Sequence, residues 1–347
     1  MKKYIKFLIT KAALVAIFML AGCSSSQQEV VYRNFTMDTL ATIHVFYEGT
    51  GSQRQQDYHM NIAREAFAVV QEVEGMFDRF DPNSYISRIN NAGGEYVEVH
   101  PYVITVLEKS QYFRELTNGA FDITVGRVMD LWDFTGEQTI PSEEELAEAL
   151  TTVGSNIIIS GNRVRLENPD AVIDVGGIAK GFAADVAGMF LYERGFAGII
   201  NLGGDTFLAG NKPDGTPWAL GIRKPSADLL SEENFGHFEL WGNIASATSG
   251  VTERHFFHEG RRMHHKINTI TGWPIETDIT SITVIAPTGL LAEGLTTAIF
   301  ALSMEESGVL LNHFRDVAAL IIIGYEEDAF TTPNITDGTF PFFLHSN

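Results

Sequence analysis

Apolar and polar residues follow two periods along this chain, and together they predict a mixture of strands and helices. Segment 39–47 is rich in β-branched and aromatic residues, which indicates a strand. Apolar residues at helical spacing over 62–77 predict an amphipathic helix packed on the core. Further helices are expected over 103–116, 142–150, 182–193 and 290–302. Short β runs lie between them without strict βαβ alternation, so the pattern predicts the α+β class.

Two strand-like runs break into paired glycines beside a carboxylate, at 173–185 and at Asn201-Leu202-Gly203-Gly204-Asp205. Glycine lets backbone N–H groups approach a ligand closely, as phosphates require, and Lys180 adds a positive charge at the first turn. The spacing matches neither the Rossmann Gly-x-Gly-x-x-Gly pattern nor the P-loop pattern. A paired glycine alone more often marks a simple turn, so this feature indicates a phosphate site only together with other motifs.

The N-terminus carries a different signal. Four lysines precede or interrupt an apolar stretch at 7–21, which is too short to span a bilayer comfortably and ends in Leu20-Ala21-Gly22-Cys23. This segment resembles a bacterial lipobox. We interpret residues 1–22 as a lipoprotein signal peptide, Cys23 as the lipidation site, 23–30 as a polar tether and 31–345 as the folded domain. The protein is therefore expected to be exported and lipid-anchored to a membrane on its extracytoplasmic side, which is the periplasmic side in a Gram-negative cell.

The net charge of the chain limits the classes of ligand that it can bind. The chain has 44 acidic and 24 basic residues, a formal charge of −20. Removing residues 1–22 takes away four lysines and no acids, which gives −24. Such a protein repels nucleic acid, so no nucleic-acid partner is expected. A phosphorylated small molecule is repelled as well unless local lysines and a divalent cation offset the charge, and a metal is therefore expected.

An ordered series of motifs resembles the ApbE family, the FAD:protein FMN transferases, across nearly all of the chain after residue 30. The motifs include Met37-Asp38-Thr39, 77–90, 119–126, 131–134, 174–181, 201–205, Thr248-Ser249-Gly250, 265–272 and 292–298. Four positions depart from the family pattern: Asp38 replaces a glycine, Asn268-Thr269 replaces Asp-Pro, and Glu293 replaces an aspartate. Glutamate still offers oxygen to Mg²⁺, although its extra methylene changes its reach.

The resemblance implies a fold and an activity. The fold would be ApbE-like (T-fold-like), with two parts around a central FAD cleft. The activity would be Mg²⁺-dependent transfer of FMN from FAD, the substrate, to a threonine hydroxyl of acceptor flavoproteins that carry a threonine-containing flavinylation motif, with release of AMP. Mg²⁺ would act as the cofactor.

The resemblance also implies a metal site. Gly177 would offer its carbonyl, and Glu293 and Thr297 their side-chain oxygens. The i, i+4 spacing of the last two places them on one helical face. The alternative is structural: a glutamate that caps a helix, beside a threonine bonded to its own helix.

Several residues are expected to contact FAD. Phe80 would stack on the flavin ring, and Lys180 would neutralise a phosphate or contact the flavin. Asp122 and Asp174 would accept hydrogen bonds from adenine, ribose or flavin N–H groups, or else cap turns. The remaining pocket residues are expected to be Met37, Ala120, Phe121 and Ile267.

His265 is the candidate general base for the incoming hydroxyl, with a purely FAD-binding role as the alternative. The nearby His255, His258 and His264 raise the possibility of a zinc site. Alternation along a strand sends neighbouring side chains to opposite faces, and no cysteine assists, so zinc is disfavoured.

Two other functions stay open. An FAD pyrophosphatase would use water as the nucleophile and would need the same pocket and metal. A flavin-binding lipoprotein without turnover would keep the aromatic pocket but would not need the metal ligands.

Overall fold

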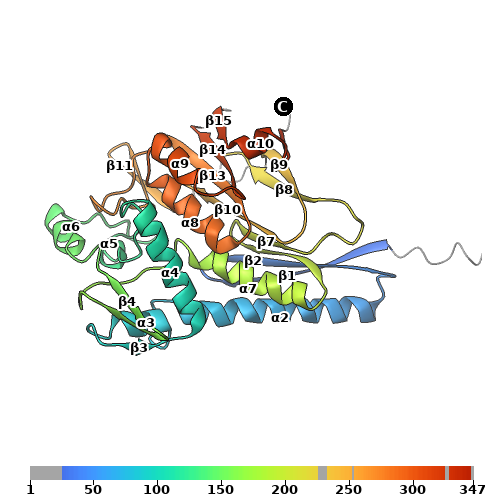
Figure 1. Cartoon of the computed structure of the whole chain (residues 1–347), viewed down its shortest axis with the longest axis horizontal. Helices are drawn as coiled ribbons and strands as arrows, with labels where there is room; N and C mark the ends of the chain where they lie inside the picture. The colour runs from blue at the N-terminus through green and yellow to red at the C-terminus, as the bar shows by residue number, and fades with distance from the viewer. Residues whose placement is uncertain (1–25, 226–232, 252–253, 325–327, 345–347) are drawn as a thin grey trace, which may run out of the picture.

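The computed structural model describes residues 26–225, 233–251, 254–324 and 328–344, so the predicted signal peptide and Cys23 lie outside the described residues. An antiparallel sheet of eight strands runs through the molecule in the order β1-β2-β6-β7-β10-β13-β14-β15 (Figure 1). Its strands are β1 Ser26–Thr36, β2 Thr39–Gly49, β6 Ala197–Leu202, β7 Asp205–Ala209, β10 Ile244–Gly250, β13 Ile279–Ala286, β14 Ala318–Ile323 and β15 Asp328–Thr331.

Three helices cover one face of this sheet: α2 Gln53–Phe77, α7 Ala179–Glu193 and α8 Gly289–Phe300 (Figure 1). Alternate strand residues such as Ile43, Ile200 and Val284 are fully buried against them in the main core. Other strand residues, such as Leu208, Ile285 and Leu320, belong to a second core on the opposite face. A three-stranded sheet forms that core with them, in the order β16 Phe342–Leu344, β9 Asn234–Leu240 and β8 Trp218–Arg223, together with α10 Pro333–Thr336.

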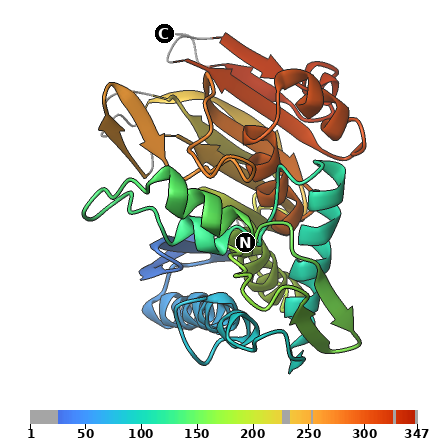
Figure 2. The same cartoon turned by 90° about the vertical axis from the view of Figure 1, so that its left-hand side faces the viewer.

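A second group of elements lies beyond the ends of α7 and α8 (Figure 2). It holds α3 Tyr85–Asn90, α4 Pro101–Leu116, α5 Gly126–Met129, α6 Glu143–Leu150, a small sheet of β3 Val97–Glu98, β5 Arg163–Leu166 and β4 Ile157–Ser160, and the hairpin of β11 His255–His258 and β12 Arg261–His264. A third core, which includes Trp132, Phe134 and Phe256, joins the α5–α6 segment to this hairpin. Helix α9, Met304–Leu311, follows α8.

The α+β prediction is confirmed, and each of the five predicted helices exists. The capping box of Ser142 and Glu145 opens α6 as expected. Helix α2 begins at Gln53, earlier than predicted, because Ser52 and Gln55 form a capping box ahead of the apolar stripe. None of the helices in the described ranges is long and apolar enough to cross a bilayer.

The predicted tether at 23–30 is wrong for residues 26–30. These residues form the start of β1 and pair with Gly49 to Val45 of β2. Only Val30 among them is buried, because β1 is at the edge of the sheet. An edge strand needs little apolar surface, so its polar sequence resembles that of a linker.

Candidate functional site

A cavity of about 680 Å³ lies where the N-terminal end of α7 meets α8 and the two segments at 120–135 and 265–269. Apart from Met37 and Cys23, every residue predicted for the site lines this cavity: Phe80, Ala120, Phe121, Asp122, Asp174, Gly177, Lys180, His265, Ile267, Glu293 and Thr297. Met37 packs against the main core beside Asp38, which does line the cavity. The motifs scattered along the sequence therefore converge on one place.

Lys180 sits between two buried carboxylates. Its ammonium donates to the carboxylate of Asp205 and, at 2.5 Å, to Oε1 of Glu293. Burial alone would lower the pKa of Lys180, but the charges of Asp205 and Glu293 raise it well above its ordinary value. The second oxygen of Glu293 accepts from the backbone N–H of Gly181 at 2.8 Å. The three side chains form a compact charged cluster with a net charge of −1.

Next to this cluster, the hydroxyl of Thr297 donates to the carbonyl oxygen of Gly177 at 2.9 Å. Glu293 and Thr297 both line the cavity from α8, one turn apart. The wall thus presents a backbone carbonyl, a hydroxyl and a carboxylate, all hard oxygen donors of the kind that suits Mg²⁺. Within the described residues no three His, Cys, Asp or Glu side chains gather as a metal-binding group. A cation here would therefore depend on the carbonyl and hydroxyl oxygens as well.

The two predicted aspartates differ in how deeply their carboxylates are buried. Asp122 is buried; one oxygen pairs with Arg114 at 2.9 Å, and the other accepts from the backbone and hydroxyl of Thr124. Its carboxylate therefore already has partners that hold the turn. Asp174 pairs with Arg79 at 3.1 Å and accepts from Gly176 N–H, and its side chain stays partly exposed.

Aromatic rings occupy two sides of the cavity. Phe80 is 76% exposed, and the Arg79 guanidinium lies 4.5 Å from its ring centre. On another wall Trp132 and Phe134 stack at 5.5 Å, and the Trp132 indole donates to the carbonyl of Gly272. An exposed ring at a cavity is suited to stacking on a planar ligand.

His265 is partly buried and lines the cavity from the segment after β12. Burial, followed by the nearby charge of Lys266, holds its pKa well below the ordinary value. The imidazole is therefore neutral at pH 7 and able to accept a proton.

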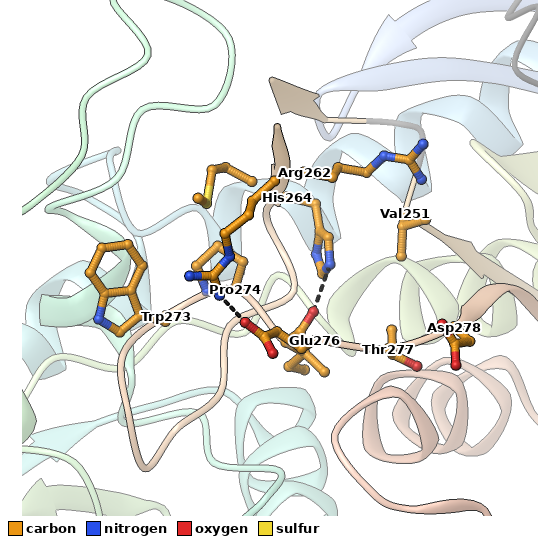
Figure 3. Close-up of a pocket in the computed structure, with 11 residues that line it drawn as sticks. Val251, Arg262, His264, Trp273, Pro274, Glu276, Thr277 and Asp278 are labelled. Carbon is orange, nitrogen blue, oxygen red and sulfur yellow. Dashed lines mark hydrogen bonds and ion pairs between the residues drawn. The ribbon is translucent and has the colours of Figure 1, made fainter. Parts of the chain in front are cut away.

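A smaller cavity of about 570 Å³ lies behind the hairpin, between β12 and segment 273–278 (Figure 3). There His264 bonds to the carbonyl of Ile275 at 3.0 Å, and Arg261 pairs with Glu276 (Figure 3). Burial lowers the pKa of His264 to about 4. These contacts hold segment 273–278 against the hairpin that leads to His265. His255 faces His264 across the hairpin, and the described chain has no metal-binding group there.

The model of the ApbE family matches residues 37–321. The chain belongs to the ApbE family. Among its relatives, the FAD:protein FMN transferase of Vibrio cholerae is 30% identical over 327 residues, which cover 91% of this chain and 95% of the relative. The enzyme of the same name from Haemophilus influenzae is 29% identical, with 93% and 94% covered.

Solved ApbE structures share the fold. The ApbE protein of Thermotoga maritima matches with a TM-score of 0.77 and 29% identity, covering 92% of this chain and all of the other. The flavin transferase ApbE of Vibrio cholerae matches with a TM-score of 0.77, 26% identity and the same coverage. The α+β architecture described above is thus that of ApbE flavin transferases.

Sequence reasoning did not assign a role to four other cavity residues: Arg79, Ser249, Lys266 and Trp132. Nor did it assign one to Asp205, which ends the Asn-Leu-Gly-Gly-Asp motif and pairs with Lys180. All five lie in the ApbE motifs or directly beside a predicted site residue. Their place in these motifs is the feature of the sequence from which they could have been predicted as site residues.

Proposed function

We propose that this ApbE protein transfers the FMN moiety of FAD to a threonine hydroxyl of an acceptor flavoprotein and releases AMP. The observation that carries the proposal is the Lys180–Asp205–Glu293 cluster beside the Gly177 carbonyl and the Thr297 hydroxyl. The names of its relatives, FAD:protein FMN transferase, support the transfer of FMN from FAD to a protein.

The charge of the cluster supports a role for Mg²⁺. Lys180, Asp205 and Glu293 sum to −1, so a diphosphate would be repelled unless a cation entered with it. Gly177, Glu293 and Thr297 would hold Mg²⁺, and the ion would supply Lewis-acid stabilisation of the diphosphate oxygens.

Other residues of the chain would bind the flavin, neutralise the phosphates and accept the proton. Phe80 stacks on the flavin ring, and Lys180 keeps Glu293 in place and offers positive charge to the phosphates. The threonine oxygen attacks the phosphorus of the FMN half; the new O–P bond forms as the bond to the bridging oxygen breaks, and AMP leaves with that oxygen. His265, which is neutral at pH 7, accepts the hydroxyl proton.

The test is to incubate the purified protein with FAD and MgCl₂, with and without a peptide that carries a threonine acceptor motif. Flavin fluorescence on the peptide, with AMP formed in equal amount and only when peptide is present, is the expected result. Equal AMP in both reactions with no labelled peptide would establish the pyrophosphatase instead. FAD binding with no AMP in either reaction would establish a flavin-binding protein without turnover. EDTA is expected to stop the transfer.

We also propose that the protein is exported and anchored through a lipid on Cys23, a residue outside the described part of the chain. The lipobox-like Leu-Ala-Gly-Cys sequence supports this. Cells fed radiolabelled palmitate are expected to label the wild-type protein and not Cys23→Ser. Equal labelling of the two would refute the anchor.

A further inference from the structure

Helices α7 and α8 approach each other so closely that their backbones touch. A methyl group added at Gly181 would overlap the carbonyl of Gly289, and one added at Gly289 would overlap the carbonyl of Gly181. Two helices that meet through glycines touch backbone to backbone, so a small shift of one moves the groups that it presents to the other.

At this crossing each helix supplies a carboxylate to the other. Asp185 of α7 accepts from the N–H groups of Gly289 at 2.5 Å and Leu290 at 2.9 Å, the first two residues of α8. Glu293 of α8 accepts in return from Gly181 N–H, in the first turn of α7. The first N–H groups of a helix have no partner within it and carry partial positive charge, so each carboxylate is stabilised by the other helix.

We propose that Asp185 is a positioning residue for the FMN-transfer site, which it never touches. It fixes the start of α8, and Glu293 lies four residues further along the same helix, where it meets Lys180 and Gly181. This inference rests on the proposed function, because Glu293 is the side chain that Asp185 places.

An ordinary capping role would not require this bond. Thr288 already caps α8, since its hydroxyl accepts from Leu291 N–H at 3.3 Å. Asp185 differs because it reaches α8 from another helix. Thr288→Ala is therefore a matched control: it weakens the same helix end and leaves the bond between the helices intact.

The first measurement is amide hydrogen exchange in the protein without ligand. Asp185→Ala and the isosteric Asp185→Asn are expected to speed exchange at Gly181 at least tenfold, although Asp185 makes no bond to that amide. Thr288→Ala is expected to change Gly181 exchange less than twofold while it speeds exchange at Leu291. Faster exchange confined to residues 289–291 in the Asp185 variants would overturn the proposal, because it would mean that Asp185 only caps α8.

A double-mutant cycle tests the coupling directly. If Asp185 acts on Gly181 through Glu293, Asp185→Asn adds little to the exchange already produced by Glu293→Gln. Multiplicative effects of the two changes would overturn the proposal. Asp185→Asn keeps the volume of the side chain, so it supplies a folded variant if Asp185→Ala unfolds.

Activity provides an independent readout. In the Asp185 variants kcat for FMN transfer is expected to fall at least tenfold while KM for FAD changes less than threefold; Thr288→Ala changes neither at a temperature where it is folded. An equal loss in both parameters would contradict the positioning role. A wild-type protein with no FMN transfer would refute the proposed function, and the exchange measurement would still decide the role of Asp185.

Discussion

The hydroxyl of Thr297 donates to the carbonyl oxygen of Gly177 at 2.9 Å and so joins α8 to the glycine turn before α7. Thr297→Val keeps the shape and removes the hydroxyl. The lost hydrogen bond is expected to cost about 1 kcal/mol of unfolding free energy. FMN transfer is expected to fall far more, at least 100-fold, because the same oxygen would serve the Mg²⁺ site.

Thr297→Ser restores the hydroxyl and is expected to recover most of the rate. Thr105→Val removes a hydroxyl that bonds to a helix carbonyl in α4, at a residue that does not line the cavity, and serves as the control. A Thr297→Val protein that transfers FMN at the wild-type rate would remove this residue from the metal site.

Lys180 is the positive member of a buried cluster. Lys180→Met leaves Asp205 and Glu293 close together without their cation, which is expected to destabilise the protein by about 3–5 kcal/mol. Urea unfolding followed by circular dichroism measures the loss. Lys212→Met breaks a pair with Asp214 that spans 3.9 Å at the surface, and its effect is expected to stay below about 1 kcal/mol. Similar losses in the two variants would contradict the cluster.

Gly181 has no room for a side chain. Gly181→Ala is expected to push α8 away from α7, lower the melting temperature and slow FMN transfer, because the Cβ would meet backbone that cannot rotate aside. Gly75 in α2 has nothing within 4 Å of a Cβ, so Gly75→Ala is expected to stabilise the protein by about 0.5–1 kcal/mol. If both changes stabilise, the helix crossing is looser than described.

The pH dependence of FMN transfer tests His265. Because its pKa is held below the ordinary value of about 6.5, the acid limb of kcat/KM is expected to have its midpoint below pH 6.5. His265→Gln is expected to lower the rate roughly 10²- to 10⁴-fold, and His313→Gln, at an exposed surface histidine, is expected to leave it unchanged. An acid limb centred above pH 6.5 would exclude His265 as the base.

Much of this molecule could be predicted from its sequence, because local rules govern its helices. The stripe from Ile62 to Phe77 and the capping box at Ser142 depend on neighbours within a few residues, and both predictions are confirmed. The ApbE motifs likewise predicted which residues would meet at the cavity, and all of those in the described part of the chain except Met37 line it.

What could not be predicted depends on topology. Lys180 pairs with Asp205, 25 residues away in the sequence, and with Glu293, 113 residues away. No local sequence pattern predicts a cluster formed over such separations. The sequence predicts that Asp122 binds the ligand, but in the structure its carboxylate pairs with Arg114 on the neighbouring helix. The start of β1 reads as a linker because pairing with β2, rather than apolar burial, makes it a strand.

The stability of the protein below neutral pH is expected to depend on His264. Its pKa is about 4 in the fold and about 6.5 when unfolded, so between these values the unfolded chain binds more protons and stability falls as the pH falls. The full effect is about 3 kcal/mol between pH 7 and pH 4.

Asp185, whose pKa burial raises to about 7, contributes with the opposite sign over the same range, so the wild-type curve alone mixes the two. His264→Gln keeps an amide able to donate to Ile275 and leaves Asp185 unchanged. The difference in unfolding free energy between wild type and His264→Gln, measured by urea titration from pH 7 to pH 4, is therefore expected to shift by about 3 kcal/mol against the wild type. A constant difference across this range would show that His264 is free to take up a proton in the folded protein.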